Sequence, residues 1–346
     1  EAVSDDCLVQ AFEQVEAVRD DISLSYFEFT TLAALLILQQ SALDCAVLEV
    51  GLGGRLDTVN LVDTDCAVIT PIGLDHQDFL GPDLLSIAAE KAGIIRAGKA
   101  VVCTQTNPPA PILTAAEKLQ APVYRRLIDF DLTHYSGPGQ KLLQFSMGDQ
   151  SIRVPSPAMA GKHQYDNLSA ALAALVLLNP RCRVKVAEIS AAIRNCRVPG
   201  RLQLVHGSPE ILLDVGHNAL AAEAVAAYLK ENKRTNTTCV LAMLADKPAE
   251  AVALALGGVC KRWLCADSSG DRGQSGRSLT RRVKSVLPGA EVSFFGPLGD
   301  AMQFALANAD ETETILIFGS FTTVSAAASW IQNSMQHDRH DTAKIP

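Results

Sequence analysis

Apolar residues along this chain follow two patterns. Short continuous apolar runs, bounded by loops rich in glycine and proline, predict buried strands of parallel sheets. Longer segments with helical spacing of their apolar residues predict helices between those strands. The predicted strands cover residues 45–50, 65–70, 100–104, 211–214, 239–244, 262–266 and 314–318. Strands that alternate with helices indicate an α/β fold.

Helical spacing appears in segments that flank most of the predicted strands. The predicted helices cover residues 1–21, 31–40, 81–97, 168–178, 186–196, 219–230 and a closing segment that ends near 333, and a further helix follows the strand at 239–244. Residues 105–156 contain many turn residues and short β-like runs. We interpret this stretch as a variable, β-rich part of a first domain.

Proline and glycine at 197–201 interrupt both periodicities where the pattern changes. We therefore predict a first domain at 1–197, a hinge at 198–208 and a second α/β domain at 209–335. The polar residues 336–346 predict a flexible tail.

Composition narrows the class of protein. The chain has 346 residues and 48% hydrophobic composition, enough for two separate cores. No apolar run reaches the roughly 20 residues that span a bilayer. The net charge of -8 gives no general attraction to nucleic acid or to anionic membranes. Nine cysteines without Cys-x-x-Cys spacing indicate a reducing compartment. We expect a cytoplasmic monomer that binds neither nucleic acid nor membrane.

A glycine-rich turn follows Glu49, the residue near the end of the first predicted strand. The carboxyl ends of parallel strands face the ligand crevice, so Glu49 is expected there together with Asp75 and His76, which follow the second strand. Taken singly, a carboxylate at a strand end is about twice as often an ion-pair or capping residue as a metal ligand. His76 alone fits a loop hydrogen bond, and Lys91 alone fits a solvated helix lysine.

Two glycine patterns imitate nucleotide-binding loops without fitting them. Residues 93–99 match Gly-x4-Gly-Lys, but Ala100 stands where a Ser or Thr should reach magnesium. The segment also lies between a helix and a strand, the reverse of the order that points backbone N–H groups at phosphate. The turn that begins at Gly51 has Leu56 in place of the third glycine of a dinucleotide fingerprint.

Six motifs in a fixed order resemble a known family. They are Glu49-Val-Gly-Leu-Gly-Gly-Arg-Leu-Asp57-x-x-Asn60, Leu74-Asp75-His76, Glu90-Lys91-Ala-Gly-Ile94, Pro199-Gly200-Arg201, Asp214-x-x-His217-Asn218 and Gly319-Ser320-Phe321. Together they resemble the bifunctional dihydrofolate synthase/folylpolyglutamate synthase family of the Mur ligase superfamily, over nearly the whole chain up to about residue 335. The resemblance implies a P-loop-type ATPase domain followed by a smaller Rossmann-like domain.

The reaction that this resemblance implies is an ATP-dependent carbon-nitrogen ligation. A carboxylate of dihydropteroate or of a reduced folate is phosphorylated, and the amino group of L-glutamate displaces phosphate from the acyl phosphate. Such an intermediate needs a site that excludes water, which a hinge permits. A monofunctional folylpolyglutamate synthase and an inactive fragment that only binds ligand remain alternatives. The Gly-Leu-Gly-Gly-Arg-Leu-Asp turn matches the folate branch and so disfavours a peptidoglycan Mur ligase.

The same resemblance assigns the metal site. Glu49 and His76 match magnesium ligands, and Lys91 matches a lysine that is carbamylated in this family. A carbamate turns a cationic side chain into a carboxylate-like ligand, which suits a second magnesium ion beside ATP. These three residues are the expected catalytic group.

The ATP and substrate contacts are also carried over by position. Asn167 matches an adenine or ribose contact, Arg201 a phosphate contact and Asp214 a ribose-hydroxyl contact, with His217 near the phosphates. For Arg201 and Asp214, an ion pair at the hinge is about equally probable on residue type alone. The turn with Arg55 and Asp57 matches the folate side, and Ser320 matches a contact to the incoming glutamate.

Two departures from the family pattern affect these expectations. The family's phosphate loop belongs upstream of the region matched by residues 1–40, so we expect the ATPase domain to be incomplete at its N-terminus. On that expectation, residues 1–346 alone bind ATP poorly and are inactive. Thr322 follows Gly319-Ser320-Phe321 where close relatives have His, which affects the predicted glutamate pocket.

Overall fold

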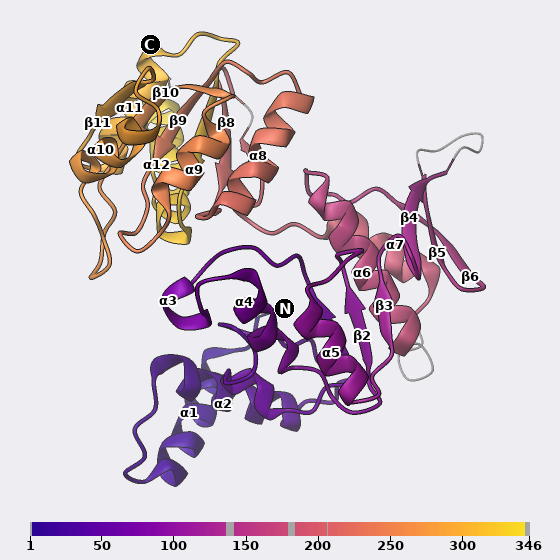
Figure 1. The fold of residues 1–346 in the computed structure, drawn as a ribbon. Helices are drawn as coiled ribbons and strands as arrows, with labels where there is room; N and C mark the ends of the chain where they lie inside the picture. Colours follow the sequence, from indigo (N-terminus) through magenta and orange to yellow (C-terminus); the bar gives the residue numbers. More distant parts are fainter. Residues whose placement is uncertain (1, 136–141, 179–183, 206, 343–346) are drawn as a thin grey trace. The chain divides into compact units, whose positions relative to one another are not determined.

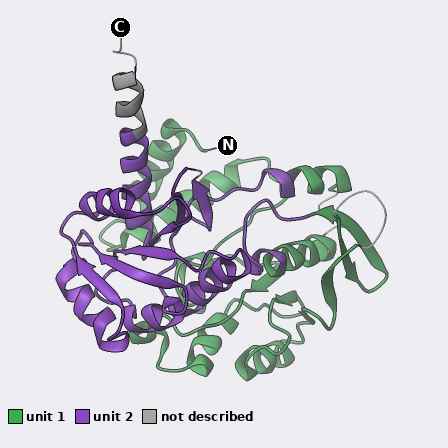
Figure 2. Cartoon of the chain, turned by 90° about the horizontal axis from the view of Figure 1, so that it is seen from above, with its two compact units in different colours: residues 1–155, 166–191 green, residues 156–165, 192–346 purple. Residues whose placement is uncertain are grey.

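The computed structural model describes residues 2–135, 142–178, 184–205 and 207–342. It divides into two compact units (Figure 2): the first contains residues 1–155 and 166–191, and the second contains residues 156–165 and 192–346. The predicted domain boundary after residue 197 lies close to the change of unit at residue 192. The segment 156–165, which the sequence places in the first domain, groups with the second unit. The hinge at 198–208 stays a prediction.

The first unit begins with two helices, α1 (Asp5–Arg19) and α2 (Tyr26–Gln40), which pack against each other (Figure 1). Helix α2 has a complete capping box: the Ser25 hydroxyl accepts from the Glu28 N–H, and the Glu28 carboxylate accepts from the Ser25 N–H. Both exposed donors are thereby satisfied, which fixes where the helix begins. A small cluster of apolar side chains joins the two helices.

A parallel three-stranded sheet forms the centre of this unit. Its order is β1 (Cys66–Ile69), β2 (Ala100–Cys103) and β3 (Val123–Arg125). The short helix α3 (Gln77–Leu80), α4 (Leu84–Ala92) and α5 (Ala110–Lys118) follow β1 and β2 in the chain. Buried residues of β1, β2, α4 and α5 form one core. The loop after β1 and the C-terminal end of α4 therefore both extend from elements that share this core.

An antiparallel sheet and two helices complete the first half of the chain. The sheet order is β4 (Phe130–His134), β5 (Leu142–Met147) and β6 (Gln150–Pro155), followed by α6 (His163–Leu178) and α7 (Val186–Asn195). The predicted β-rich stretch also contains the helix α5, which begins after Pro109. Proline is common both in turns and at the first positions of a helix, so Pro109 and Pro111 do not distinguish a turn from the start of α5. Residues 136–141 of the predicted stretch lie outside the described residues.

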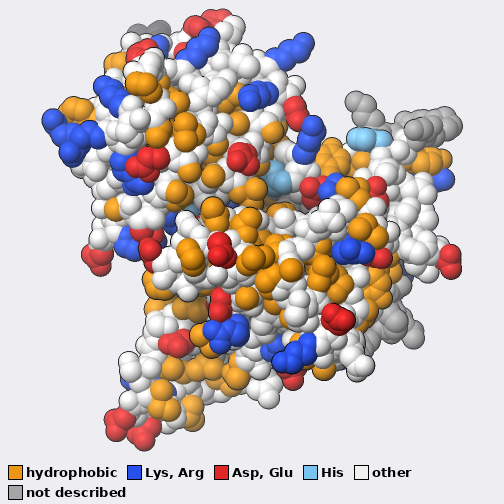
Figure 3. Space-filling model, in the orientation of Figure 1, with side chains coloured by type: hydrophobic (Ala, Val, Ile, Leu, Met, Phe, Trp, Pro, Cys, Tyr) orange, Lys and Arg blue, Asp and Glu red, His pale blue; other side chains and the backbone are white. Residues whose placement is uncertain are grey.

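The predicted strand at 45–50 is wrong. These residues belong to no strand, and Val47 is 94% exposed. Figure 3 shows hydrophobic side chains over much of the visible face of this unit, and the exposed ones include Leu56 and Phe79. An apolar run favours burial, but a strand also needs a neighbour that accepts its hydrogen bonds, and no described strand pairs with this run.

The second unit is a doubly wound sheet of six strands, in the order β11-β10-β9-β12-β8-β7. Its strands are β7 (Gln203–Val205), β8 (Glu210–Asp214), β9 (Thr237–Leu241), β10 (Cys260–Cys265), β11 (Glu291–Phe294) and β12 (Thr314–Phe318). All neighbours are parallel except β7, which runs antiparallel to β8 at the edge. The predicted Rossmann-like domain is confirmed in this architecture.

Helices cover both faces of this sheet. They are α8 (Ala219–Glu231), α9 (Ala249–Leu256), α10 (Gly276–Val286), α11 (Leu298–Asn308) and α12 (Phe321–Thr342). Residues of α8, α9 and α10 share one core cluster with Cys239 and Leu241, whereas residues of α11 and α12 share another with Val240. Successive residues of β9 thus point to opposite cores, as expected in a sheet covered on both sides.

Four elements of the second unit were not predicted: α10, β11, α11 and the edge strand β7. In α10 the buried apolar residues, Leu279 and Val283, stand among four cationic residues, which hides its helical stripe. Helix α12 continues to Thr342, through most of the segment predicted as a tail, and residues 343–346 lie outside the described part. Within the described residues, no helix combines the length and the apolar character needed to cross a membrane.

Candidate functional site

The loop after β1 carries the first group of candidate residues. His76 has a left-handed backbone, with φ of 52°, immediately before α3. Its N–H donates to Oδ1 of Asp75 at 2.8 Å, and its Nε2 lies 3.8 Å from the same oxygen. A side chain other than glycine in this conformation costs free energy, so the surrounding structure must hold it there. Asp75 thus holds the backbone of His76, and its carboxylate lies near the ring.

Lys91 lies in the last turn of α4 and is half-buried. Burial lowers the pKa of its ammonium group because it disfavours the charged form, and the nearby Asp75 carboxylate opposes this effect. Asp75 therefore interacts with both His76 and Lys91, two residues that the sequence assigned to one metal site. Asp75 itself was not assigned a role, although its position in the Leu74-Asp75-His76 motif was the available signal. Glu49 lies exposed at the end of the segment that forms no strand.

The glycine turn docks on the end of α4, next to Lys91. The N–H of Arg55 donates to the carbonyl oxygen of Glu90 at 2.8 Å, and its guanidinium donates to Oε1 of Glu90 at 2.9 Å. A Cβ on Gly54 would lie 2.8 Å from that carbonyl oxygen, and a Cβ on Gly93 would lie 2.4 Å from Cβ of Arg55. Glycine at both positions permits this close approach of two backbones.

Two further polar side chains hold the turn in place. Asn60 donates from Nδ2 to the carbonyl oxygens of Arg55, at 3.2 Å, and Gly93, at 3.1 Å. Arg96 donates from Nη2 to the backbone oxygen of Asn60, at 2.7 Å, and to its side-chain oxygen, at 2.9 Å, and also pairs with Asp63. We call this set of contacts between residues 54–63 and residues 90–96 the turn clamp. It fixes the backbone on both sides of Lys91.

The two residues predicted to contact folate have structural partners. Oδ2 of Asp57 accepts from the Leu52 N–H at 2.8 Å, and Oδ1 accepts from the Val59 N–H at 2.9 Å, which caps the short 3-10 helix η1 (Thr58–Leu61). Arg55 pairs with Glu90, as described above. A carboxylate has further lone pairs and the Arg55 side chain is exposed, so the folate contacts stay predictions.

The second group of candidate residues lies at the carboxyl end of β8. Asp214 is 7% exposed, and its carboxylate accepts from the N–H groups of Leu202, at 2.9 Å, and Gly216, at 2.8 Å. Burial raises the pKa of Asp214, although these two hydrogen bonds and the nearby Arg201 and His163 oppose the shift. Asp214 thus closes the turn at residues 200–202 onto the end of the strand.

The remaining predicted residues of this unit lie at two strand ends. Nδ1 of His217 lies 3.2 Å from the carbonyl oxygen of Val215, in the connection from β8 to α8. Ser320 is buried after β12, where its hydroxyl accepts from the Thr323 N–H at 3.0 Å. The Arg201 guanidinium lies 5.5 Å from the ring of Phe321, the residue after Ser320. Their ligand roles stay predictions.

Asn167 is placed differently from its sequence prediction. It was expected just before a helix, but α6 begins at His163, so Asn167 lies within the helix and is exposed. The Gly161 turn before this helix has a φ of 99°, and the ring of His163 lies against it. The nucleotide contact of Asn167 stays a prediction.

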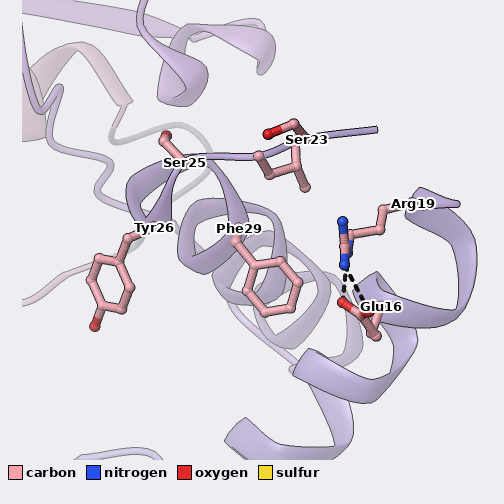
Figure 4. Close-up of a pocket in the computed structure, with 7 residues that line it drawn as sticks. Glu16, Arg19, Ser23, Ser25, Tyr26 and Phe29 are labelled. Carbon is pink, nitrogen blue, oxygen red and sulfur yellow. Dashed lines mark hydrogen bonds and ion pairs between the residues drawn. The ribbon is translucent and has the colours of Figure 1, made fainter. Parts of the chain in front are cut away.

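A pocket of about 290 Å³ lies between the end of α1 and the start of α2 (Figure 4). Its lining residues are Glu16, Arg19, Ser23, Leu24, Ser25, Tyr26 and Phe29. Arg19 and Glu16 form a two-point ion pair, with Nε–Oε2 at 2.6 Å and Nη2–Oε1 at 2.8 Å. The two opposite charges that line the pocket thus neutralise each other.

Family models match both halves of the chain. Residues 15–175 match the Mur ligase middle domain, and residues 200–321 match the Mur ligase glutamate ligase domain. The dihydrofolate synthase/folylpolyglutamate synthase of Escherichia coli (strain K12) is 36% identical over 316 residues, which cover 91% of this chain and 71% of the relative. The match of residues 200–321 to the glutamate ligase domain includes the strands β8, β9, β10 and β12.

Solved structures agree with this match. A structure of E. coli FolC in complex with DHPP and ADP is 34% identical, with a TM-score of 0.88, and the similarity covers 97% of this chain and 78% of that one. A structure of the bifunctional folylpolyglutamate synthase/dihydrofolate synthase with Mn, AMPPNP and L-glutamate bound is 33% identical, with a TM-score of 0.83, covering 96% of this chain and 78% of that one. The chain belongs to the dihydrofolate synthase/folylpolyglutamate synthase family of Mur ligases.

Proposed function

We propose that this protein is an ATP-dependent carbon-nitrogen ligase that joins L-glutamate to dihydropteroate and to reduced folates. The observation that carries the proposal is the similarity over nearly the whole chain to an E. coli enzyme solved with DHPP and ADP. A second similar structure holds L-glutamate with an ATP analogue and manganese. Those ligands are the substrate classes that the proposed reaction needs.

The proposed reaction has two steps. The acceptor's carboxylate oxygen attacks the γ-phosphorus of ATP, so that ADP leaves and an acyl phosphate forms. The amino nitrogen of L-glutamate then attacks the acyl carbon, the C–O bond to phosphate breaks, and the nitrogen loses a proton as the amide forms. Both steps concentrate negative charge on phosphate oxygens, so positive groups held at those oxygens lower the barrier.

Glu49, His76 and Lys91 are the residues that would hold divalent metal in this protein. A bound metal supplies positive charge to the phosphate oxygens. Carboxylates suit such ions, imidazole binds the softer divalent ions, and carbamylation would make Lys91 a third ligand and the second anionic one. Two observations support this: the Asp75 carboxylate accepts from the backbone N–H of His76, and burial lowers the pKa of Lys91, which favours the neutral amine that reacts with carbon dioxide.

We assign the nucleotide contacts to Asn167, Arg201, Asp214 and His217, and the glutamate contact to Ser320. The position of Asp214, His217 and Ser320 after parallel strands supports the assignment, because ligands of open α/β sheets bind at that edge. The exposed guanidinium of Arg201 is available for an anion. Arg55 and Asp57 are assigned to the folate side.

The test is formation of ADP by the complete protein in the presence of ATP, magnesium, L-glutamate and an acceptor. We expect ADP to form with dihydropteroate and also with a tetrahydrofolate, and to need glutamate for sustained turnover. Absence of ADP with both acceptors would contradict the proposal. Activity with tetrahydrofolate alone would instead identify a monofunctional folylpolyglutamate synthase.

Two measurements that do not depend on catalytic turnover test the inactive-fragment alternative and the expected monomer. Calorimetry with ADP and magnesium on residues 1–346 measures nucleotide binding directly, and tight binding would contradict the expectation that this chain binds ATP poorly. Sedimentation of the same sample measures its mass, and a dimer would contradict the expected monomer.

A further inference from the structure

Two loops at the carboxyl edge of the second unit's sheet are tied to each other. One follows β9 and covers residues 243–247; the other follows β10 and covers residues 266–275. The Met243 carbonyl accepts from the Ser268 hydroxyl at 2.7 Å and from Nε2 of Gln274 at 3.1 Å. The Leu244 carbonyl accepts from the same Gln274 nitrogen at 3.2 Å. We call residues 243–247 the clamped loop.

An ion pair between two helices completes the attachment. Nε of Arg282, on α10, donates to Oε1 of Glu250 at 2.7 Å, and its Nη2 donates to Oε2 at 2.6 Å; Glu250 lies on α9. The same guanidinium donates to the carbonyl oxygens of Ala245, at 3.1 Å, and Lys247, at 2.8 Å. Arg282 holds the pKa of the Glu250 carboxyl below its usual range. One side chain therefore binds α9 and the loop before it at four points.

These contacts are unusual for a loop, because irregular backbone normally satisfies its carbonyl groups with water. Here the carbonyls of residues 243, 244, 245 and 247 all accept from side chains of one neighbouring segment. The carbonyl groups of the clamped loop are thus fixed before any ligand binds. Ala245 and Asp246 remain exposed on it.

The clamped loop lies beside the turn that carries Ser320. Strand β9 is the neighbour of β12, and Oγ1 of Thr323 donates to the carbonyl oxygen of Ala242 at 2.7 Å. Gly319 has a φ of 132°, and a Cβ there would lie 2.2 Å from the same oxygen. The loop and the Ser320 turn are therefore adjacent at the edge where open α/β sheets bind ligands.

We propose that Arg282 and Glu250 are positioning residues that hold the clamped loop in the shape that binds the incoming L-glutamate. The inference rests on the proposed ligase function and on the match of residues 200–321 to the glutamate ligase domain. A preformed loop loses little conformational entropy on binding a small, flexible amino acid, and that lowers the concentration at which the amino acid saturates the site. Arg282 and Glu250 act through the loop rather than on the substrate.

The test uses Arg282→Lys and Glu250→Gln in the complete protein. Lysine keeps the charge of Arg282 but cannot contact both carboxylate oxygens and both carbonyls. We expect the KM for L-glutamate to rise about tenfold, whereas the KM values for ATP and dihydropteroate and the value of kcat change less than about twofold, the pattern of lost binding rather than lost chemistry.

The matched control is a second arginine-glutamate pair of the same unit. Nε and Nη2 of Arg234 both donate to Oε2 of Glu210, at 3.1 and 2.6 Å, and this pair lies at the opposite, amino-terminal edge of the sheet. Its side chains are 19% and 34% exposed, similar to 24% and 40% for Arg282 and Glu250. Arg234→Lys and Glu210→Gln should lower the melting temperature by a similar amount and leave the KM for glutamate unchanged.

Two results would overturn the inference while the wild-type protein remains active. One is an unchanged KM for glutamate in both variants, and the other is an equal rise in the KM values for all three substrates. Circular dichroism on the same samples confirms that each variant is folded. An inactive wild-type protein would instead contradict the proposed function itself, so the two failures are distinguishable.

Discussion

Glu49→Gln is expected to lower turnover of the complete protein by about 100-fold or more, while its melting temperature changes by less than about 1 °C. Glutamine keeps the size of the side chain but removes the negative charge that a divalent cation requires. Glu49 is exposed and lies in a segment without strand partners, so its charge contributes little to folding. The measurement is ADP formation at saturating substrates, together with a melting curve.

Glu117→Gln is the control for this change, because Glu117 is also exposed and lies on α5 of the same unit. It should leave both turnover and melting unchanged. Wild-type turnover in the Glu49 variant would support the ordinary interpretation, in which this carboxylate is an ion-pair residue. A large loss of melting temperature would show that the charge stabilises the fold.

Gly93→Ala is expected to lower both stability and turnover through the turn clamp. The added Cβ would lie 2.4 Å from Cβ and 2.5 Å from Cα of Arg55, and so would force the turn away from α4. Overpacking of this kind costs about 1–3 kcal/mol, which corresponds to several degrees of melting temperature. Gly93 has φ of -62° and ψ of -12°, which alanine adopts readily, so the cost comes from the contact and not from the backbone.

Gly289→Ala provides the matched control. A Cβ at that position would meet no atom within 4 Å. Melting followed by circular dichroism and ADP formation are measured for both variants. We expect turnover to fall with the Gly93 substitution even at temperatures where the variant is fully folded, because the clamp fixes the backbone around Lys91. A Gly93 variant as stable and active as the Gly289 variant would show that the turn has room to move.

Periodicity predicted those elements whose apolar pattern lies within their own residues. The strand Thr314–Phe318 is wholly buried, and the residues of β9 alternate between two apolar cores, so burial and pattern agree there. The run 45–50 is also mostly apolar but pairs with no described strand, and apolar composition alone cannot distinguish the two cases. The antiparallel partner of β8, residues 203–205, was missed because its pairing depends on a neighbour rather than on its own pattern.

The candidate site was likewise predictable in part: the positions of its residues could be predicted, but not their contacts. The sequence placed His76 after a strand and Asp214 at the end of one, where the structure has them. It placed Lys91 within a helix at 81–97, whereas α4 ends at Ala92, so that Lys91 lies in its last turn. Their partners were not predictable: the contact between Arg55 and Glu90 joins residues 35 apart in the chain, and the pair of Arg282 and Glu250 joins residues 32 apart. No periodicity encodes such pairs, because each depends on how separate elements pack together.

The turn clamp also has a consequence for how the first unit opens. The clamp joins residues on either side of β1 and α3, so it forms only after those elements have brought the two segments together. Amide protons buried by such long-range contacts exchange with solvent only when the whole group of elements separates. The N–H of Arg55 should therefore exchange as slowly as those of β1. Lys91 would then become buried in the same cooperative folding step in which the strands of this sheet pair.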